Sequence, residues 1–249
     1  MTRVLITRPL EASLQLAEQL KDLGLRPIVM PFYRFAALQP ETDFNAAWSS
    51  AGRKLAVFTS PRAVEFGLPL IADDVLPGLQ FAVVGAASAA ALQAAGYPHQ
   101  LQAKSGYTSE DLLDMPELHS EPGKVVIFCA PGGRQTLATG LHDLGWEVTR
   151  AKVYERISQQ PNDEQLDDLA NANQLVSVWT SASALTLAQQ YLPAELWSKV
   201  LQAPALVISK RIQHHLESLG ATNVAMSNGP GNAELLEAIM QMLGIRISG

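Results

Sequence analysis

Short loops that follow apolar runs and open helical segments carry the residues most able to bind a ligand. They are small, hydroxylated or glycine-rich, and they occupy residues 59–62, 85–88, 131–134, 180–183 and 209–211. In open parallel sheets, ligands bind beyond the carboxyl ends of the strands, where such loops lie. The free N–H groups and positive dipole of a helix start favour carboxylates or phosphates there. For any single loop, the alternative is that its Ser and Thr residues only cap the helix.

Motifs for cofactors and metals do not fit. The strings VVGAAS and PGGRQT lack the glycine spacing of dinucleotide- and phosphate-binding loops. The five histidines are scattered without ligand spacing, so no metal site is expected. Cys129 ends the apolar run VVIFC, where a cysteine usually acts as a small hydrophobe. The expectation is an enzyme or binding protein without a cofactor.

Composition limits the class of protein. The chain has 249 residues, of which 47% are hydrophobic and 17% charged, a length that suits two domains. Its net charge of −6 argues against broad nucleic-acid binding, which needs a basic surface. No apolar run is long enough to span a bilayer, and the first residues do not resemble a signal peptide. We therefore expect a soluble, cytoplasmic protein that binds neither nucleic acid nor membranes.

An internal repeat organises the chain. Residues 3–35 align with residues 124–156 without a gap, so that Tyr33 falls on Tyr154. The same register places Thr59-Ser60 on Thr180-Ser181. With small gaps, the match continues from Phe81 on Ala205 and from GYTSEDLL on GPGNAELL. The chain is thus two copies of one unit.

Each copy is predicted to be an α/β unit with a parallel sheet flanked by helices. The pattern is strand-helix-strand, then two strand-loop-helix segments and a last helix, with short apolar runs typical of buried parallel strands. The first helix shows apolar residues at helical spacing, and four glycines are predicted to end helices; these are Leu14, Leu16, Ala17, Leu20 and Leu23, and Gly24, Gly96, Gly145 and Gly220.

The repeat alone leaves two topologies open. In one, the chain divides near residue 121. In the other, the first strand-helix-strand joins the last three elements, and the middle of the chain forms an inserted domain. Two strands, near residues 33–38 and 154–158, would then cross between the domains.

Several strings together resemble the uroporphyrinogen-III synthase family over nearly the whole chain. They are VLITRP, VFTSPRAV, VVGAASAAAL, LHDLGWEVTRAKVYER, WTSASAL and GPGNAELLEAI. The resemblance implies the inserted topology, with residues 1–36 and 157–249 in one domain, residues 37–156 in the other, and a two-strand linker. It also implies a lyase without a cofactor, acting on the small molecule hydroxymethylbilane. A monomer is our separate expectation.

The resemblance implies roles for residues. Hydroxymethylbilane carries eight carboxylates, and its hydroxyl leaves readily because the pyrrole is electron-rich. Tyr154 matches the family's tyrosine at the linker and is the candidate to hydrogen-bond the departing hydroxyl. Candidates to hold carboxylates are Thr59, Ser60, Arg62, Ser88, Gly132, Gly133, Arg134, Thr180 and Ser181.

Two points weaken or compete with these assignments. The loop ISKRIQ departs from the family pattern, so no firm role is assigned to residues 209–212. As charged partners of the substrate carboxylates, Arg8 and Lys210 are weaker candidates than Arg62 and Arg134. The rival interpretation is a non-catalytic two-lobed protein that binds a small anion, since fold alone does not exclude it.

Overall fold

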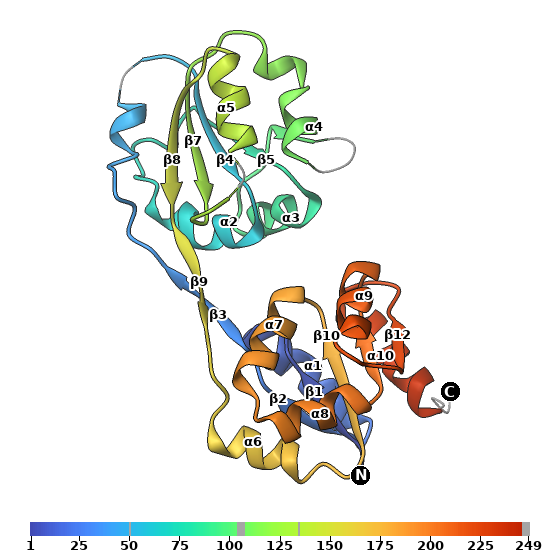
Figure 1. Cartoon of the computed structure of the whole chain (residues 1–249). Helices are drawn as coiled ribbons and strands as arrows, with labels where there is room; N and C mark the ends of the chain where they lie inside the picture. The colour runs from blue at the N-terminus through green and yellow to red at the C-terminus, as the bar shows by residue number, and fades with distance from the viewer. Residues whose placement is uncertain (50, 104–107, 134, 246–249) are drawn as a thin grey trace. The chain divides into compact units, whose positions relative to one another are not determined.

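The computed structural model describes residues 1–49, 51–103, 108–133 and 135–245. By internal contacts the chain divides into two units, of which the first comprises Met1–Arg34 and Ile157–Gly249 and the second Phe35–Arg156. Figure 1 shows each unit as a sheet with helices on its faces.

In the described part of the first unit, a parallel sheet of five strands has the order β12-β11-β10-β1-β2. The strands are β1 (Arg3–Ile6), β2 (Arg26–Val29), β10 (Leu175–Trp179), β11 (Ala205–Val207) and β12 (Val224–Met226). The helices are α1 (Leu10–Asp22), α6 (Asp163–Ala170), α7 (Ala182–Tyr191), α8 (Ala194–Gln202), α9 (Lys210–Ser218) and α10 (Asn232–Leu243).

The described part of the second unit has a matching parallel sheet in the order β6-β5-β4-β7-β8. The strands are β4 (Lys54–Phe58), β5 (Leu79–Val83), β6 (Leu101–Gln102), β7 (Lys124–Cys129) and β8 (Glu147–Lys152). The helices are α2 (Pro61–Gly67), α3 (Ala86–Ala94), α4 (Ser109–Leu113) and α5 (Thr136–Asp143), with short 3₁₀ turns at Ala46–Trp48, Leu68–Leu70 and Pro116–Leu118. Strands β3 (Tyr33–Ala37) and β9 (Tyr154–Ser158) pair in a sheet of their own.

The two sheets have the same strand order under the internal repeat. The repeat places β7 on β1 and β4 on β10, and these pairs lie next to each other in their sheets. The fold class expected from the sequence, two similar units with parallel sheets flanked by helices, is therefore confirmed. The short outer strands β6 and β12 were not expected.

Alternating side chains of the second sheet build a core on each face. One core joins Phe58 and Phe128 to α2 and α3, and the other joins Val57 and Ile127 to α4 and α5. Both β4 and β7 are almost wholly buried, as expected for central parallel strands. Because β4 and β7 run parallel, the loops that follow them both lie at the carboxyl edge of the sheet.

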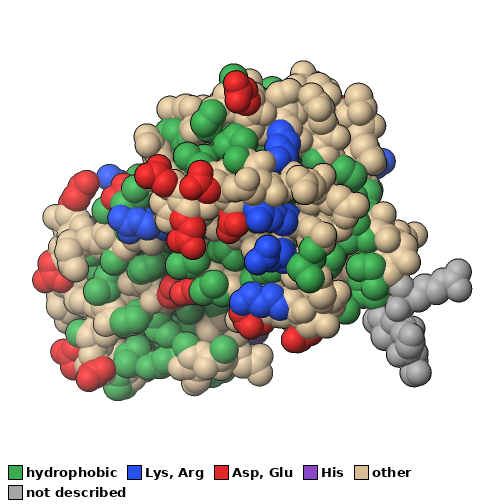
Figure 2. All heavy atoms as spheres, turned by 90° about the horizontal axis from the view of Figure 1, so that it is seen from below, with side chains coloured by type: hydrophobic (Ala, Val, Ile, Leu, Met, Phe, Trp, Pro, Cys, Tyr) green, Lys and Arg blue, Asp and Glu red, His purple; other side chains and the backbone are tan. Residues whose placement is uncertain are grey.

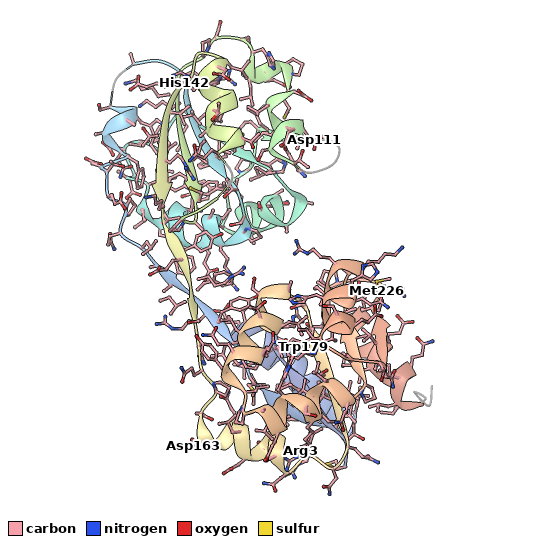
Figure 3. The ribbon with its side chains drawn as sticks, viewed as in Figure 1. Arg3, Asp111, His142, Asp163, Trp179 and Met226 are labelled. Atoms are coloured by element: carbon pink, nitrogen blue, oxygen red, sulfur yellow. The ribbon has the colours of Figure 1, made fainter. Side chains whose placement is uncertain are left out.

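The first unit is built in the same way. Val4, Ile6 and Val178 pack against apolar residues of α1 and α10. Trp179 is fully buried and stacks on Phe32 with ring centroids 6.3 Å apart, and Figure 3 shows it inside this unit.

Most predicted helix details are confirmed. The four glycines predicted to end helices follow α1, α3, α5 and α9, each with a φ between 75° and 108°. Such angles suit glycine because it has no Cβ. Of the apolar residues at helical spacing in α1, Leu14 is 50% exposed, and Ser13 is buried instead. The Ser13 hydroxyl donates to the Arg8 carbonyl at 2.7 Å, which satisfies a polar group on the buried side.

The surface seen from below in Figure 2 mixes acidic, basic and hydrophobic side chains. In the first unit, Arg3 pairs with Asp168 at 3.2 Å and Lys21 with Glu18 at 2.7 Å. Charges of both signs meet there, unlike the uniformly basic surface of a nucleic-acid-binding protein. Among the described residues, no helix is long and apolar enough to span a membrane.

Candidate functional site

The loop after β4 is held at the carboxyl edge of the second sheet by two hydroxyl groups. The Thr59 hydroxyl donates to the Phe128 carbonyl at 3.0 Å and so ties the loop to β7. The Ser60 hydroxyl accepts from the Ala63 N–H at 3.0 Å and caps α2, and Pro61 follows at the first helical position. This is the arrangement that a Ser-Pro helix start favours.

Tyr154 lies beside this loop. Its hydroxyl lies 2.9 Å from the Ser60 hydroxyl, and either group can be the donor. The ring of Tyr154 packs edge-on against Phe35 and stacks on Phe66, both with centroids 5.8 Å apart. Because aromatic neighbours hold the ring, the phenol group is fixed in place at the edge of the sheet.

These groups open into one pocket of about 240 Å³ within the second unit. Thr59, Ser60 and Tyr154 line it together with Gly133 from the loop after β7. Side chains from α5 and β7, including Leu137 and Ile127, form its apolar walls; the other lining residues are Ser109, Cys129, Ala130, Ala138 and Arg150. The structure thus brings four of the sequence-predicted residues to a single pocket.

Arg150 is a lining residue that sequence reasoning missed. It is on β8, and its Nη2 lies 3.4 Å from the Gly133 carbonyl oxygen and 3.8 Å from the Cys129 sulfur. In the strand EVTRAK, an arginine is expected to face solvent. The composition of this strand therefore does not indicate a residue that lines a pocket. The internal repeat does contain a signal, because it pairs Arg150 with Val29 and Cys129 with Arg8. Of these two positions, the first copy has its arginine at Arg8, and the second copy has its arginine at Arg150.

Cys129 is buried, as expected of a small hydrophobe, and belongs to the apolar core between the sheet, α4 and α5. It also lines the pocket, which the sequence did not suggest. Among the described residues, no cluster of His, Cys, Asp or Glu side chains could hold a metal ion.

Other predicted residues of the second unit are not among those that line this pocket. The Arg62 side chain pairs with Glu65 and lies over the Phe35 ring, with its guanidinium carbon 4.9 Å from the centroid. Ser88 is buried in the first turn of α3. Gly132 is exposed, with a φ of 70°. Arg134 lies outside the described residues.

The remaining predicted residues belong to the first unit. Thr180 follows β10, and Ser181 precedes α7 without a side-chain capping bond. Their repeat partners Thr59 and Ser60 both make bonds that fix the loop in the second unit. Ser209 caps α9 through the Ile212 N–H at 3.4 Å, so this divergent loop keeps an ordinary helix start.

Arg8 is the notable cation of the first unit. Its Nη1 donates to the Asn232 side-chain oxygen at 2.6 Å, at the start of α10. Burial lowers the pKa of the Arg8 guanidinium below its ordinary value, and the electrostatic interaction with Tyr33 acts in the opposite direction. Arg8, Asn232 and Tyr33 are the repeat partners of Cys129, Ser109 and Tyr154, which all line the pocket of the second unit.

Comparison with known proteins points to one family. A family model described as uroporphyrinogen-III synthase HemD matches residues 15–237. The uroporphyrinogen-III synthase of Escherichia coli K12 is 28% identical over 246 residues, covering 95% of this chain and 99% of that protein. A putative uroporphyrinogen-III synthase of Methanothermobacter thermautotrophicus is 28% identical over 73% of this chain and 74% of that protein.

Solved structures share the fold at low sequence identity. A uroporphyrinogen-III synthetase from Helicobacter pylori superposes with a TM-score of 0.64 at 16% identity, covering 97% of this chain and 100% of that chain. A mutant uroporphyrinogen III synthase from Thermus thermophilus gives a TM-score of 0.58 at 18% identity, with 98% and 100% covered.

Proposed function

The chain belongs to the uroporphyrinogen-III synthase family, and we propose that it converts hydroxymethylbilane into uroporphyrinogen III at the pocket beside Ser60 and Tyr154. The activity places it in porphyrin and haem biosynthesis as a lyase. We further infer a monomeric enzyme of the cytoplasm, whose mass in solution can be measured by light scattering.

The proposed reaction begins with loss of the substrate's hydroxyl group as water. The electron-rich pyrrole supplies the electrons that expel the hydroxyl, leaving an azafulvenium cation, and a proton delivered to the hydroxyl completes the water molecule. The last ring then attacks through its substituted carbon, forming a spiro intermediate that fragments and recloses with that ring inverted. Because the cation forms easily, the main task of the protein is to orient the ends and exclude water.

The observation that carries this proposal is the hydrogen bond between Tyr154 and Ser60, in the pocket that the loops after β4 and β7 line. A phenol that is 2.9 Å from a capping hydroxyl can give its proton to a third oxygen while the serine stays bonded to the helix. Tyr154 is therefore the proposed donor to the leaving hydroxyl. General acid assistance contributes about 10²–10⁴ in rate.

The helix starts are the proposed carboxylate sites. Thr59, Ser60 and Gly133 line the pocket, and we assign carboxylate binding to their N–H groups. The other predicted loops are proposed to bind further carboxylates, at Ser88, Gly132, Thr180 and Ser181. Arg62 and Arg134 remain proposed charged partners.

The test is to incubate the purified protein with freshly made hydroxymethylbilane and to analyse the isomers after oxidation to porphyrins. We expect uroporphyrin III to predominate and activity to survive chelation and dialysis. A protein that only binds anions would yield the uninverted isomer at the spontaneous rate, and that result would reject the proposed function.

A further inference from the structure

Arg150 is the cation that lines the pocket of the second unit, and no carboxylate pairs with it among the described residues. Its contacts within the described residues are the long ones to the Gly133 carbonyl and the Cys129 sulfur. By contrast, Lys152 on the same strand lies 3.4 Å from a Glu41 carboxylate oxygen. A half-buried guanidinium has five N–H donors, and the two acceptors near Arg150 use only part of them.

The pocket around Arg150 suits an anion with an apolar body. Hydroxyl groups of Thr59, Ser60 and Tyr154 line it, the walls are aliphatic, and no acidic residue is among its described lining residues. A guanidinium in such surroundings binds a carboxylate through two parallel N–H donors, more strongly than it would in open water.

The size of the pocket limits what it takes. At about 240 Å³, it is smaller than the pockets of roughly 300–1,000 Å³ that enclose drug-sized ligands. A linear tetrapyrrole cannot enter as a whole, so the pocket accepts one ring or its side chains. Because Tyr154 and Arg150 line the same space, the groups that they bind must be close together on the substrate.

We propose that Arg150 binds a carboxylate of the same pyrrole ring whose hydroxyl is protonated by Tyr154. This inference rests on the proposed function and adds an anchoring residue to it. The salt bridge would hold the ring so that its hydroxymethyl group meets the phenol. Arg150 is then a substrate-binding residue and takes no part in proton transfer.

The experiment compares Arg150→Gln and Arg150→Lys with Lys152→Met, which removes a charge from the same strand outside the pocket. Arg150→Gln should raise KM about 10- to 100-fold, because a hydrogen bond to a charged group is lost. If the contact forms in ground state and transition state alike, kcat should stay within about threefold. Arg150→Lys should fall between, since it keeps the charge without the planar fork. Lys152→Met should match the parent.

A substrate analogue identifies the ring. If one acid side chain of the hydroxymethyl-bearing ring is replaced by methyl, the parent should show the raised KM, and Arg150→Gln should add little to it. The same replacement on another ring should leave the full effect of Arg150→Gln. Additive effects on the first analogue would overturn the ring assignment, and a KM for Arg150→Gln equal to that of the parent would overturn the inference altogether.

Two controls separate this inference from its alternatives. Thermal unfolding of each variant identifies a loss of folded protein, in which case the milder Arg150→Lys decides the question. If the parent protein yields only the uninverted isomer, the proposed function fails on its own. Equilibrium dialysis with uroporphyrinogen III then tests Arg150 directly, and unchanged binding in Arg150→Gln would reject its role.

Discussion

The two units use one fold but differ at the carboxyl edge of their sheets. In the second unit, Cys129 and Ser109 are short, and a pocket lies between them and Tyr154. In the first unit, the repeat places Arg8 and Asn232 at these positions, and their side chains bond to each other at 2.6 Å. The repeated fold thus supplies the same edge in both units, whereas the side chains at these two repeat positions bond to each other in the first unit and line a pocket in the second.

The tyrosines of the two units should differ most in activity. Tyr154 is half-buried, bonded to Ser60 and exposed to the pocket, whereas its repeat partner Tyr33 is 5% exposed. Tyr154→Phe should lower kcat by about 10²-fold or less, the lower end for general acid catalysis, because the azafulvenium forms easily. Tyr33→Phe should leave turnover nearly unchanged.

Initial rates and isomer ratios are measured for both tyrosine variants, with thermal unfolding alongside. The product of Tyr154→Phe should remain mainly the inverted isomer. Parental rates in this variant would reduce Tyr154 to a packing residue, and a rate loss that parallels unfolding would assign it a structural role.

Much of the fold could be predicted because it follows from local periodicity. Short apolar runs, amphipathic segments and glycines such as Gly24 and Gly145 act over a few residues, and the repeat shows each signal twice. Strand partners could not be settled in this way. The pairing of β1 with β10 joins Val4 to Val176, and a pattern of similar apolar runs does not select such distant neighbours.

The candidate site was predicted only in part, for a related reason. Thr59, Ser60 and Gly133 are in loops whose composition signals a helix start. Arg150, on β8, lines the pocket together with Cys129 of β7 and Gly133 of the loop that follows β7. Contacts between adjacent strands of this kind depend on register, which the composition of one strand does not reveal.

The helix after the Thr-Ser pair also differs between the two units. Gly67 in α2 lies against Phe128, and a Cβ there would come within 2.5 Å of the Phe128 ring. The repeat pairs these residues with Ala188 in α7 and with Thr7, which directly follows β1. The first unit thus has the larger residue on the helix and the smaller residue beside the sheet. Gly67→Ala should destabilise the protein by about 1–3 kcal/mol through overpacking.

Phe128 has little room to yield, because it is fully buried and stacks on Phe58 at 4.8 Å. Denaturant unfolding of Gly67→Ala, Phe128→Leu and the double variant measures the coupling between the two sites. We expect the double variant to lose less stability than the sum of the single changes. Strict additivity would show that the two residues do not compete for space.

The two serines at the matching helix starts make different bonds. Ser60 caps α2 through the Ala63 N–H, whereas Ser181 makes no side-chain capping bond to α7. Ser60→Ala should therefore lower the unfolding free energy by about 1 kcal/mol, the usual loss for a capping serine. Ser181→Ala should cost only a few tenths, about the level of a surface substitution. Equal losses in urea titrations would contradict the difference in capping.

The smallest expected effect concerns the hydrogen bond between the Arg8 and Asn232 side chains in the first unit. Asn232→Ser gives this unit the residue that its repeat partner Ser109 supplies in the second, and it removes the acceptor of the Arg8 guanidinium. Because both side chains are only partly buried, water can replace much of the bond, and the unfolding free energy should fall by about 0.5–1 kcal/mol.

Arg8→Cys makes the matching exchange at the other end of the bond, since Cys129 is the repeat partner of Arg8. The double variant has neither Arg8 nor Asn232, so no side chain is left without its partner. Its stability should therefore exceed the value expected from adding the two single changes. Ser109→Ala is the control, with an expected change within about 0.5 kcal/mol. If Asn232→Ser is as neutral as Ser109→Ala, the bond does not stabilise the first unit, and its contrast with the open pocket is one of side-chain size alone.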